Sequence, residues 1–348
     1  IKHIPLLKKK ELIFLQSIGP RLGGLLTKDI GELKRIFLSP GPIFDPEDRM
    51  DDYWGYTEAF YSVGFRPGDV VQVTFNYHLS PAGLMFEEPL RNLGCASIPA
   101  GPTDPGTQLD IMQKLRVSGY VGTASYLMHL AQKAEEKGIN LRKDLFQEVA
   151  FVTGERLSEK MRNQLEKKFD IILRQGYGTA DVGCIGYECF HKTGLHISNR
   201  CYVEICHPDT GIPLKDGEVG EIVVTSFNKT YPLIRLATGD LSYIDRAPCA
   251  CGRTSPRLGS IVGRVDTTAR IKGMFVYPHQ VEQVMARFED IKRWQIEVIN
   301  PGGIDEMILY VEASNFHQED ELLHLFRERI KLRPELKVLA PGTLPPQI

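Results

Sequence analysis

The sequence has no long apolar run, no strong charge of either sign and no repeated or low-complexity segment. No stretch approaches the roughly 18–20 apolar residues of a membrane-spanning helix, and the N-terminus does not follow a signal-peptide pattern. The formal net charge is −2, and the lysines and arginines are scattered along the chain. These absences argue against a membrane protein, and against a nucleic acid or a membrane surface as a partner.

Cysteine is also scarce for a disulfide-based fold. The seven cysteines are an odd number and lack the density of a secreted disulfide scaffold. We therefore expect a cytoplasmic location, with some cysteines available for a metal. The 348 residues exceed one average domain, and the 42% hydrophobic and 25% charged content is ordinary for a globular protein. One large and one small domain is the natural expectation.

Short β-rich runs alternate with amphipathic segments of about ten residues through the first half of the chain. The predicted strands are 36–38, 70–75, 96–99, 120–122, 149–153 and 171–173, and the predicted helices are 50–64, 84–93, 108–116 and 158–168. This alternation is typical of a mostly parallel sheet, whose ligands gather at the carboxyl ends of the strands. His78, Gly101 and Ser125 fall at such ends.

The second half changes character. Residues 201–224 alternate polar and apolar around a turn, which predicts antiparallel strands. Residues 267–348 predict a β-α-β-β-α-β order, with elements at 269–271, 278–286, 293–299, 307–311, 320–332 and 337–338. The expected fold class is α/β: a large N-terminal domain with a mostly parallel sheet and a β-rich subdomain, followed by a small α+β domain.

The stretch from Pro232 to Val284 holds the densest set of candidate site residues. It contains T-G-D ending at Asp240, a cysteine pair, G-R-V-D with Arg264, and the basic K-G at Lys272. A carboxylate followed by an arginine suits a polyhydroxylated anionic ligand, because the carboxylate accepts from hydroxyls and the guanidinium forks onto oxygens. Taken singly, Asp240 could cap a turn and Arg264 could sit in a surface ion pair.

Cysteine and histidine residues suggest a zinc site. Cys249 and Cys251 form a C-x-C-G turn, and Cys189 and His196 lie close together upstream. Two thiolates from one turn and a Cys/His pair from another would complete a tetrahedral structural site with no position open to water. The alternatives are ordinary buried thiols, or a different upstream pair chosen from Cys184, Cys201 and His191.

The ordered motifs resemble the AMP-forming acyl-adenylating ligases, and within them the phenylacetate–coenzyme A ligases. The motifs are T-G-D, G-R-V-D, the Y-G-T-A-D of residues 177–181 and the H-P-D-T-G phrase that runs on to Ile222. The resemblance covers about 36–348, with the family's first 60 or so residues missing upstream. It implies an AMP-binding domain at 1–265 and a mobile C-terminal domain at 266–348, which swings about the hinge residue Asp266.

The resemblance also implies roles for individual residues. Tyr177 stacks on adenine, or is simply a turn aromatic, and Asp181 matches an acid that holds magnesium. Thr179 substitutes for the hydroxyl lost at Ala180, and Asp240 with Arg264 binds ribose and adjacent oxygens. The further expected nucleotide-binding residues are Gly154, Glu155 and Gly178, the acyl-pocket residues are Tyr77, His78, Gly101 and Ser125, and the catalytic residues are Asp181 and Lys272, with Arg270 beside it. Some members of this subgroup with a C-x-C-G turn bind zinc.

Two departures from the family pattern concern ATP. The loop that holds its phosphates falls at residues 39–46, where only Ser39 and Gly41 suit that task and three prolines remove N–H donors. The family's catalytic lysine follows a G-T-L-P phrase, present at 342–345. No lysine follows here, so we expect either a truncated chain or a disordered tail.

The expected activity is that of an AMP-forming acid–coenzyme A ligase for an aromatic or similar carboxylate. Its cofactors would be ATP or AMP, coenzyme A, magnesium and a structural zinc, and its partners small molecules, with a homodimer as an option. The alternatives are a degenerate ligase-fold protein that binds nucleotide or acyl-CoA with weak or no adenylation, and an adenylating enzyme that loads a carrier protein.

Overall fold

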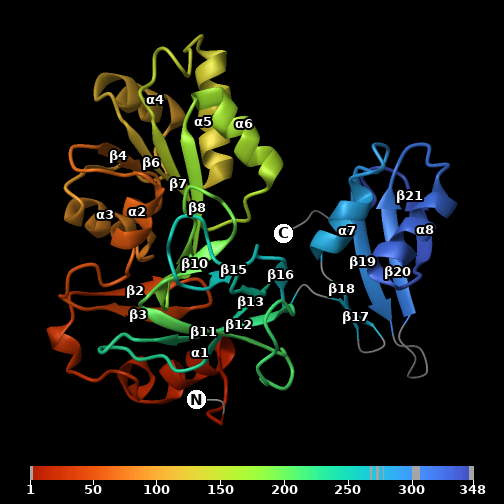
Figure 1. Cartoon of the computed structure of the whole chain (residues 1–348), viewed down its shortest axis with the longest axis horizontal. Coiled ribbons are helices and arrows are strands. Elements are labelled where there is room, and N and C mark those ends of the chain that lie inside the picture. The colour runs from red at the N-terminus through yellow and green to blue at the C-terminus, as the bar shows by residue number, and fades with distance from the viewer. Residues whose placement is uncertain (1–2, 267–268, 272–273, 277, 300–305, 345–348) are drawn as a thin grey trace. The chain divides into compact units, whose positions relative to one another are not determined.

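The structure is a computed structural model that describes residues 3–266, 269–271, 274–276, 278–299 and 306–344 (Figure 1). The chain forms two compact units. One comprises Ile1–Thr238 with Ser242–Ile261, and the other Gly239–Leu241 with Val262–Ile348. The second unit thus begins slightly before the predicted boundary at Asp266, and the hinge role of Asp266 stays a prediction. Each unit is described by itself.

The main sheet of the large unit has nine strands in the order β14-β15-β10-β9-β8-β7-β6-β4-β5. Its parallel part comprises β5 (Ala96–Pro99), β4 (Val70–Val73), β6 (Gly119–Gly122), β7 (Val149–Val152) and β8 (Ile172–Thr179). Its antiparallel part comprises β9 (Gly183–Tyr187), β10 (Leu195–Ile197), β15 (Arg257–Leu258) and β14 (Ile244–Asp245). The expected parallel arrangement is confirmed for β4 to β8, and four antiparallel strands extend the sheet beyond β8.

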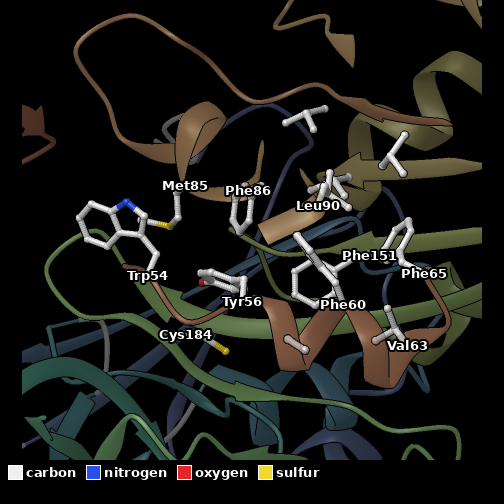
Figure 2. Close-up of a cluster of buried hydrophobic side chains, with 14 of the residues drawn as sticks. Trp54, Tyr56, Phe60, Val63, Phe65, Met85, Phe86, Leu90, Phe151 and Cys184 are labelled. Carbon is white, nitrogen blue, oxygen red and sulfur yellow. The ribbon is translucent and has the colours of Figure 1, made fainter. Parts of the chain in front are cut away.

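Helices cover both faces of the parallel strands. They are α2 (Thr57–Val63) and α3 (Ala82–Asn92) on one face, and α4 (Pro105–Lys114), α5 (Ala124–Glu136) and α6 (Glu159–Phe169) on the other. Phe60, Phe86 and Phe151 form an aromatic cluster under α2 and α3 (Figure 2). Strands β6 and β7 are buried along their whole length, and their sequences are nearly continuous in apolar residues, whereas the edge strand β5 is partly exposed.

One predicted helix was too long. Residues 50–56 are not helical, because the Asp52 carboxylate accepts from the backbone N–H groups of Tyr56 and Thr57 and ends the preceding turn there. Asp104, Thr123 and Ser158 each accept a hydrogen bond in the first turn of α4, α5 and α6. These caps fix the starts of the three helices. The start of α6 was predicted to within one residue and α4 begins three residues before its predicted start, whereas α5 was not predicted.

A second sheet carries the predicted antiparallel strands. It orders β1 (Leu7–Lys8), β13 (Leu236–Ser242), β12 (Gly220–Ser226) and β11 (Cys201–Cys206), and β16 (Gly263–Arg264) pairs with β13. The N-terminal segment adds α1 (Lys9–Ile18), the short helices η1 (Arg21–Gly24) and η2 (Ile30–Glu32), and a hairpin of β2 (Arg35–Ser39) and β3 (Ile43–Glu47).

The C-terminal unit has the predicted α+β character. Its elements are β17 (Ala269–Ile271), β18 (Met274–Val276), α7 (Pro278–Met285), β19 (Arg293–Ile299), β20 (Glu306–Glu312), α8 (Glu319–Ile330) and β21 (Glu335–Leu339). β20 pairs antiparallel with β19 and parallel with β21. Strand β18 was not predicted. Among the described residues, no helix combines the length and apolarity needed to cross a membrane.

Candidate active site and metal centre

The predicted acyl-pocket residues lie beyond the carboxyl ends of β4, β5 and β6. Tyr77 packs on Gly83 of α3, where an added Cβ would lie 2.6 Å from the tyrosine ring. Gly101 has φ +58°, its N–H donates to the Val73 carbonyl oxygen at 3.0 Å, and an added Cβ would lie 4.0 Å from the same ring. The structure therefore brings Tyr77 and Gly101 together, whereas His78 is exposed to solvent.

Ser125, Gly154 and Glu155 meet at the ends of the next two strands. The backbone N–H and the hydroxyl of Ser125 donate to the two Glu155 carboxylate oxygens at 2.6 and 2.8 Å. Gly154 has φ +84°, and an added Cβ would lie 3.9 Å from Thr123. An expected acyl-pocket residue and two expected nucleotide-binding residues thus form one exposed polar edge of the sheet.

The Y-G-T motif lies on a strand rather than in a loop. β8 extends through Thr179, with a bulge between Tyr177 and Gly178. A side chain at Gly178 would collide with the Tyr56 hydroxyl, so this position requires glycine. Tyr177 is half-buried and packs against the core beneath β9 to β12. The Thr179 hydroxyl accepts from the Val182 N–H at 3.3 Å and so closes the turn into β9.

Asp181 is not placed as a magnesium ligand. Its side chain is 1% exposed, and the Lys9 ammonium lies 2.8 Å from one carboxylate oxygen. Magnesium keeps several of its waters in most protein sites, and a covered carboxylate beside an ammonium offers neither the room nor the charge. The residues present do not fit this ion, and the expectation that Asp181 binds magnesium and acts with it in catalysis stays a prediction.

A second buried carboxylate lies near Asp181. Asp45 is fully buried on β3, and neither of its oxygens has a hydrogen-bond partner among the described residues. Burial raises the pKa of Asp45 to about 7; the Asp181 charge adds to the rise, while the Ser39 hydroxyl and the Lys9 ammonium oppose it. The sequence analysis missed both Asp45 and Lys9.

The expected phosphate loop is the tight end of the β2–β3 hairpin. Ser39 pairs with Ile43 across the turn, and its buried hydroxyl donates to the Ile43 carbonyl oxygen at 3.4 Å. Pro46 lies inside β3 and faces Ile36 of the partner strand. This segment therefore offers few of the N–H and hydroxyl donors that a triphosphate requires.

In the second unit, Asp240 and Arg264 face each other on β13 and β16. The Arg264 guanidinium donates to Asp240 at 2.9 Å and to Asp266 at 3.1 Å. Gly239 has φ +82°, and an added Cβ would lie 2.9 Å from the guanidinium. The two predicted ligand-binding residues are thus brought together. Lys272 lies outside the described residues, so its expected catalytic role stays a prediction.

Cys189, His196, Cys249 and Cys251 converge in the large unit. Their ligand atoms all lie within 4.8 Å of one another. The Cys189 and Cys249 sulfurs are 3.7 Å apart, and the Cys251 sulfur is 3.4 Å from His196 Nε2. A tetrahedral zinc with bonds of about 2.3 Å to sulfur separates its ligands by about 3.8 Å. The alternatives Cys184 and Cys201 are not part of this cluster, since both thiols are buried elsewhere in the core.

The protonation of His196 and Cys249 suits a metal, whereas burial raises the pKa of Cys189 to about 11 and opposes its thiolate form. Burial and the nearby Arg253 and Arg257 lower the pKa of His196, which favours the neutral ligand form. His196 Nδ1 lies 3.2 Å from the Ser255 hydroxyl, which leaves Nε2 toward the cysteines. Burial raises the pKa of Cys249, but hydrogen bonds from the Cys251 N–H, Thr193 and the neighbouring thiols outweigh it and lower the pKa to about 7.

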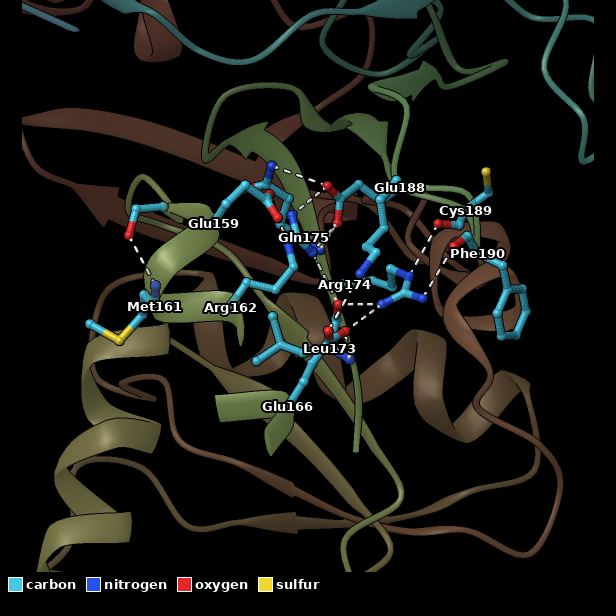
Figure 3. Close-up of polar contacts among 12 residues, drawn as sticks. Glu159, Met161, Arg162, Glu166, Leu173, Arg174, Gln175, Glu188, Cys189 and Phe190 are labelled. Carbon is cyan, nitrogen blue, oxygen red and sulfur yellow. Dashed lines mark hydrogen bonds and ion pairs between the residues drawn. The ribbon is translucent and has the colours of Figure 1, made fainter. Parts of the chain in front are cut away.

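A buried ion pair fixes the chain just before Cys189 (Figure 3). The Arg162 guanidinium donates to both Glu188 oxygens at 2.8 and 2.7 Å, and the Gln175 N–H donates to the same carboxylate at 2.8 Å. Arg174 holds the next turn by donating to the Cys189 carbonyl oxygen at 3.2 Å. No sequence pattern indicated these partners, because an arginine on an amphipathic helix is normally exposed.

Two family patterns match this chain, one in each of its two parts. The family pattern described as AMP-binding enzyme matches residues 54–229, and that of the AMP-binding enzyme C-terminal domain matches residues 273–347. A phenylacetate-coenzyme A ligase of Thermus thermophilus is 32% identical over 99% of this chain and 83% of the relative. The Escherichia coli phenylacetate-coenzyme A ligase is 28% identical over 84% of this chain and 71% of the relative.

Solved structures share the fold. A 2-hydroxyisobutyryl-CoA ligase, in an open conformation and in complex with 2-HIB-AMP and CoA, superposes with a TM-score of 0.86. It is 22% identical and covers 99% of this chain and 80% of that protein. The motifs, the fold and the sequence matches agree, and the chain therefore belongs to the AMP-binding enzyme family, as a relative of the phenylacetate–coenzyme A ligases.

Proposed function

We propose that this protein is an AMP-forming acid–coenzyme A ligase that acts on an aromatic or similar carboxylic acid. In the first half-reaction a carboxylate oxygen attacks the α-phosphorus of ATP, and pyrophosphate leaves. In the second, the coenzyme A thiolate attacks the acyl carbon, and AMP leaves. The observation that carries the proposal is the similarity to phenylacetate-coenzyme A ligases over nearly the whole chain.

The chain's own contribution is positioning and charge. Asp240 accepts from ribose hydroxyls, and Arg264, already oriented by Asp240 and Asp266, donates to neighbouring oxygens of AMP. Within the large unit, Tyr177 lies against adenine with its exposed part, and Gly154 and Glu155 border the nucleotide. Tyr77 and Gly101 border the acid, which suits a flat apolar substrate because an aromatic ring meets a position without a side chain.

Zinc is part of the proposal. The four clustered ligands fit a closed tetrahedral site, which would tie β10 to the loop before β15 and stabilise that part of the fold. The homodimer and the cytoplasmic location expected from the sequence stay predictions.

A second candidate function rests on the β2–β3 hairpin. With prolines in the turn and a buried carboxyl group at Asp45, the segment is poorly suited to the β- and γ-phosphates of ATP. A protein of this kind would bind AMP or acyl-AMP and carry out the thioester half-reaction in either direction, with weak adenylation.

The test separates the two half-reactions. With ATP, Mg²⁺ and a panel of aromatic acids, release of pyrophosphate reports adenylation. With synthetic phenylacetyl-AMP and coenzyme A, the thioester found by mass spectrometry reports the second step. Thioester without pyrophosphate supports the second candidate, whereas no product in either assay with any acid contradicts both.

AMP binding tests the nucleotide residues directly. Asp240→Ala removes a charged acceptor, so we expect AMP to bind roughly 2–3 kcal/mol more weakly, about 30- to 150-fold. Asp216→Ala is the matched control, because Asp216 forms an exposed pair with Arg246 at 2.7 Å. Equal AMP affinity of folded Asp240→Ala and wild type in calorimetry would end the assignment.

A further inference from the structure

We propose that Lys9 is a built-in cation that takes the place of a divalent ion beside Asp181, so that binding of AMP needs no metal at this acid. The inference starts from the disagreement between the family's magnesium ligand and the environment of Asp181 described above. Only the statement about AMP binding rests on the proposed function.

The position of Lys9 is fixed by the elements on either side of it. Leu7 and Lys8 pair with Leu236 and Ala237 of β13, and α1 begins at Lys9. The Lys8 N–H donates to Glu11 at 2.9 Å, which sets the first turn of the helix. The ammonium therefore reaches Asp181 from a backbone held by a strand and a cap, while about a third of the Lys9 side chain remains exposed.

Among the described residues, Lys9 is the cation in contact with this pair of acids. Asp45 and Asp181 are both covered, and none of their four oxygens accepts a hydrogen bond among the described residues, so the ion pair with Lys9 is the contact that stabilises the Asp181 charge. The Lys9 ammonium therefore supplies a positive charge directly beside this pair of covered acids.

A divalent ion would bring two charges to a cluster that already holds an ammonium. Without Lys9, the cluster would be two carboxyl groups beside the Ser39 hydroxyl, an oxygen donor set of the kind that Mg²⁺ and Mn²⁺ prefer. Removal of the lysine should therefore create a metal site where the wild type has none.

The experiment measures Mn²⁺ binding by electron paramagnetic resonance on zinc-loaded protein without nucleotide. We expect Lys9→Met to bind one Mn²⁺ at least tenfold more tightly than the wild type does. Adding Asp181→Asn to this variant should abolish the gain. Lys10→Met, an exposed neighbour on α1, is the matched control and should behave as wild type.

Two further measurements keep the proposal falsifiable if Lys9→Met folds poorly. Wild-type protein that binds Mn²⁺, and loses it on Asp181→Asn, would overturn the proposal without any lysine variant. In the nucleotide arm, AMP affinity of the wild type should change less than twofold between EDTA and Mg²⁺, and a tenfold gain with Mg²⁺ would contradict it. A complete lack of AMP binding would instead refute the proposed function and leave the Mn²⁺ result standing.

Discussion

Two clusters of ionisable side chains in the large unit differ in the source of the positive charge that faces them. The Cys189, His196, Cys249 and Cys251 cluster gathers four donors at the spacing of a tetrahedral metal. The Asp45 and Asp181 cluster instead includes its own cation, Lys9. Soft donors around an open centre favour an external ion, whereas carboxylates already facing an ammonium do not. Donor type alone therefore does not identify a metal site.

Glu188 is a third buried acid and sharpens the contrast. It is as buried as Asp45 but receives hydrogen bonds from Arg162 and Gln175. Asp45 has no such donors. Two similarly buried acids therefore differ in the hydrogen-bond donors that the fold brings to them.

Loss of the zinc site should have the largest effect. Cys249→Ser removes a ligand and should release the metal, at a cost on the order of 5 kcal/mol of unfolding free energy; structural zinc contributes about 10–16 kcal/mol in small peptides that fold only with it. Elemental analysis should find close to one zinc in the wild type and much less in the variant. Cys95→Ser, a buried thiol outside the cluster, is the control. A metal-free wild type of equal stability would mean that these are ordinary thiols.

Breaking the Arg162–Glu188 ion pair should cause the second-largest loss of unfolding free energy. Arg162→Met leaves Glu188 buried without its main partner, so we expect a loss of about 3–5 kcal/mol in urea unfolding. Lys133→Met, in an exposed pair with Glu136, should cost less than about 1 kcal/mol. Similar losses in both variants would contradict the buried role of Arg162.

Asp45 should make stability fall as the pH rises. Its pKa is raised from 3.8 to about 7, so between about pH 4 and 7 the folded protein holds a proton that the unfolded chain releases. Raising the pH through this window then favours unfolding, with a slope of up to roughly 1.4 kcal/mol per pH unit. Asp45→Asn should be more stable than wild type at pH 8, by about 2–3 kcal/mol, and similar at pH 4.

Unfolding midpoints from pH 4 to 8.5 test this expectation. Asp216→Asn, at an exposed acid, controls for the loss of one negative charge. If Asp45→Asn and wild type keep a constant difference across the whole range, the carboxyl group does not titrate in this window.

The smallest expected effect concerns ATP. Because the hairpin that replaces the phosphate loop is poor in donors and lies next to Asp45, the extra phosphates of ATP should add little to the affinity of AMP. Side-by-side calorimetry should give a difference below tenfold, about 1.4 kcal/mol. Mg-ATP binding tenfold or more tightly than AMP would mean that the hairpin is a working phosphate site.

The predictions from sequence differ in success for identifiable reasons. The strands 96–99, 149–153 and 293–299 were predicted to within a residue, since their apolar pattern and flanking turns are local. The helix predicted at 50–64 was too long, because the apolar residues of the turn around Asp52 have the same spacing as those of the helix that follows. The strand predicted at 171–173 was too short, because the glycines of the Y-G-T motif are needed for close packing within β8.

The sequence by itself determined the family and the parallel strands of the main sheet, because short motifs and local periodicity carry that information. It also proposed Cys189, His196, Cys249 and Cys251 as zinc ligands, but only the tertiary structure brings these four side chains together. Only the tertiary structure decided the partner of Asp181. Lys9 lies far from Asp181 in the sequence. No local pattern identifies a lysine at the start of a helix as the counter-ion of a distant acid. Charge neutralisation inside a fold depends on which side chains the backbone brings within a few ångströms, and that is set by the packing of α1, β13 and the hairpin together.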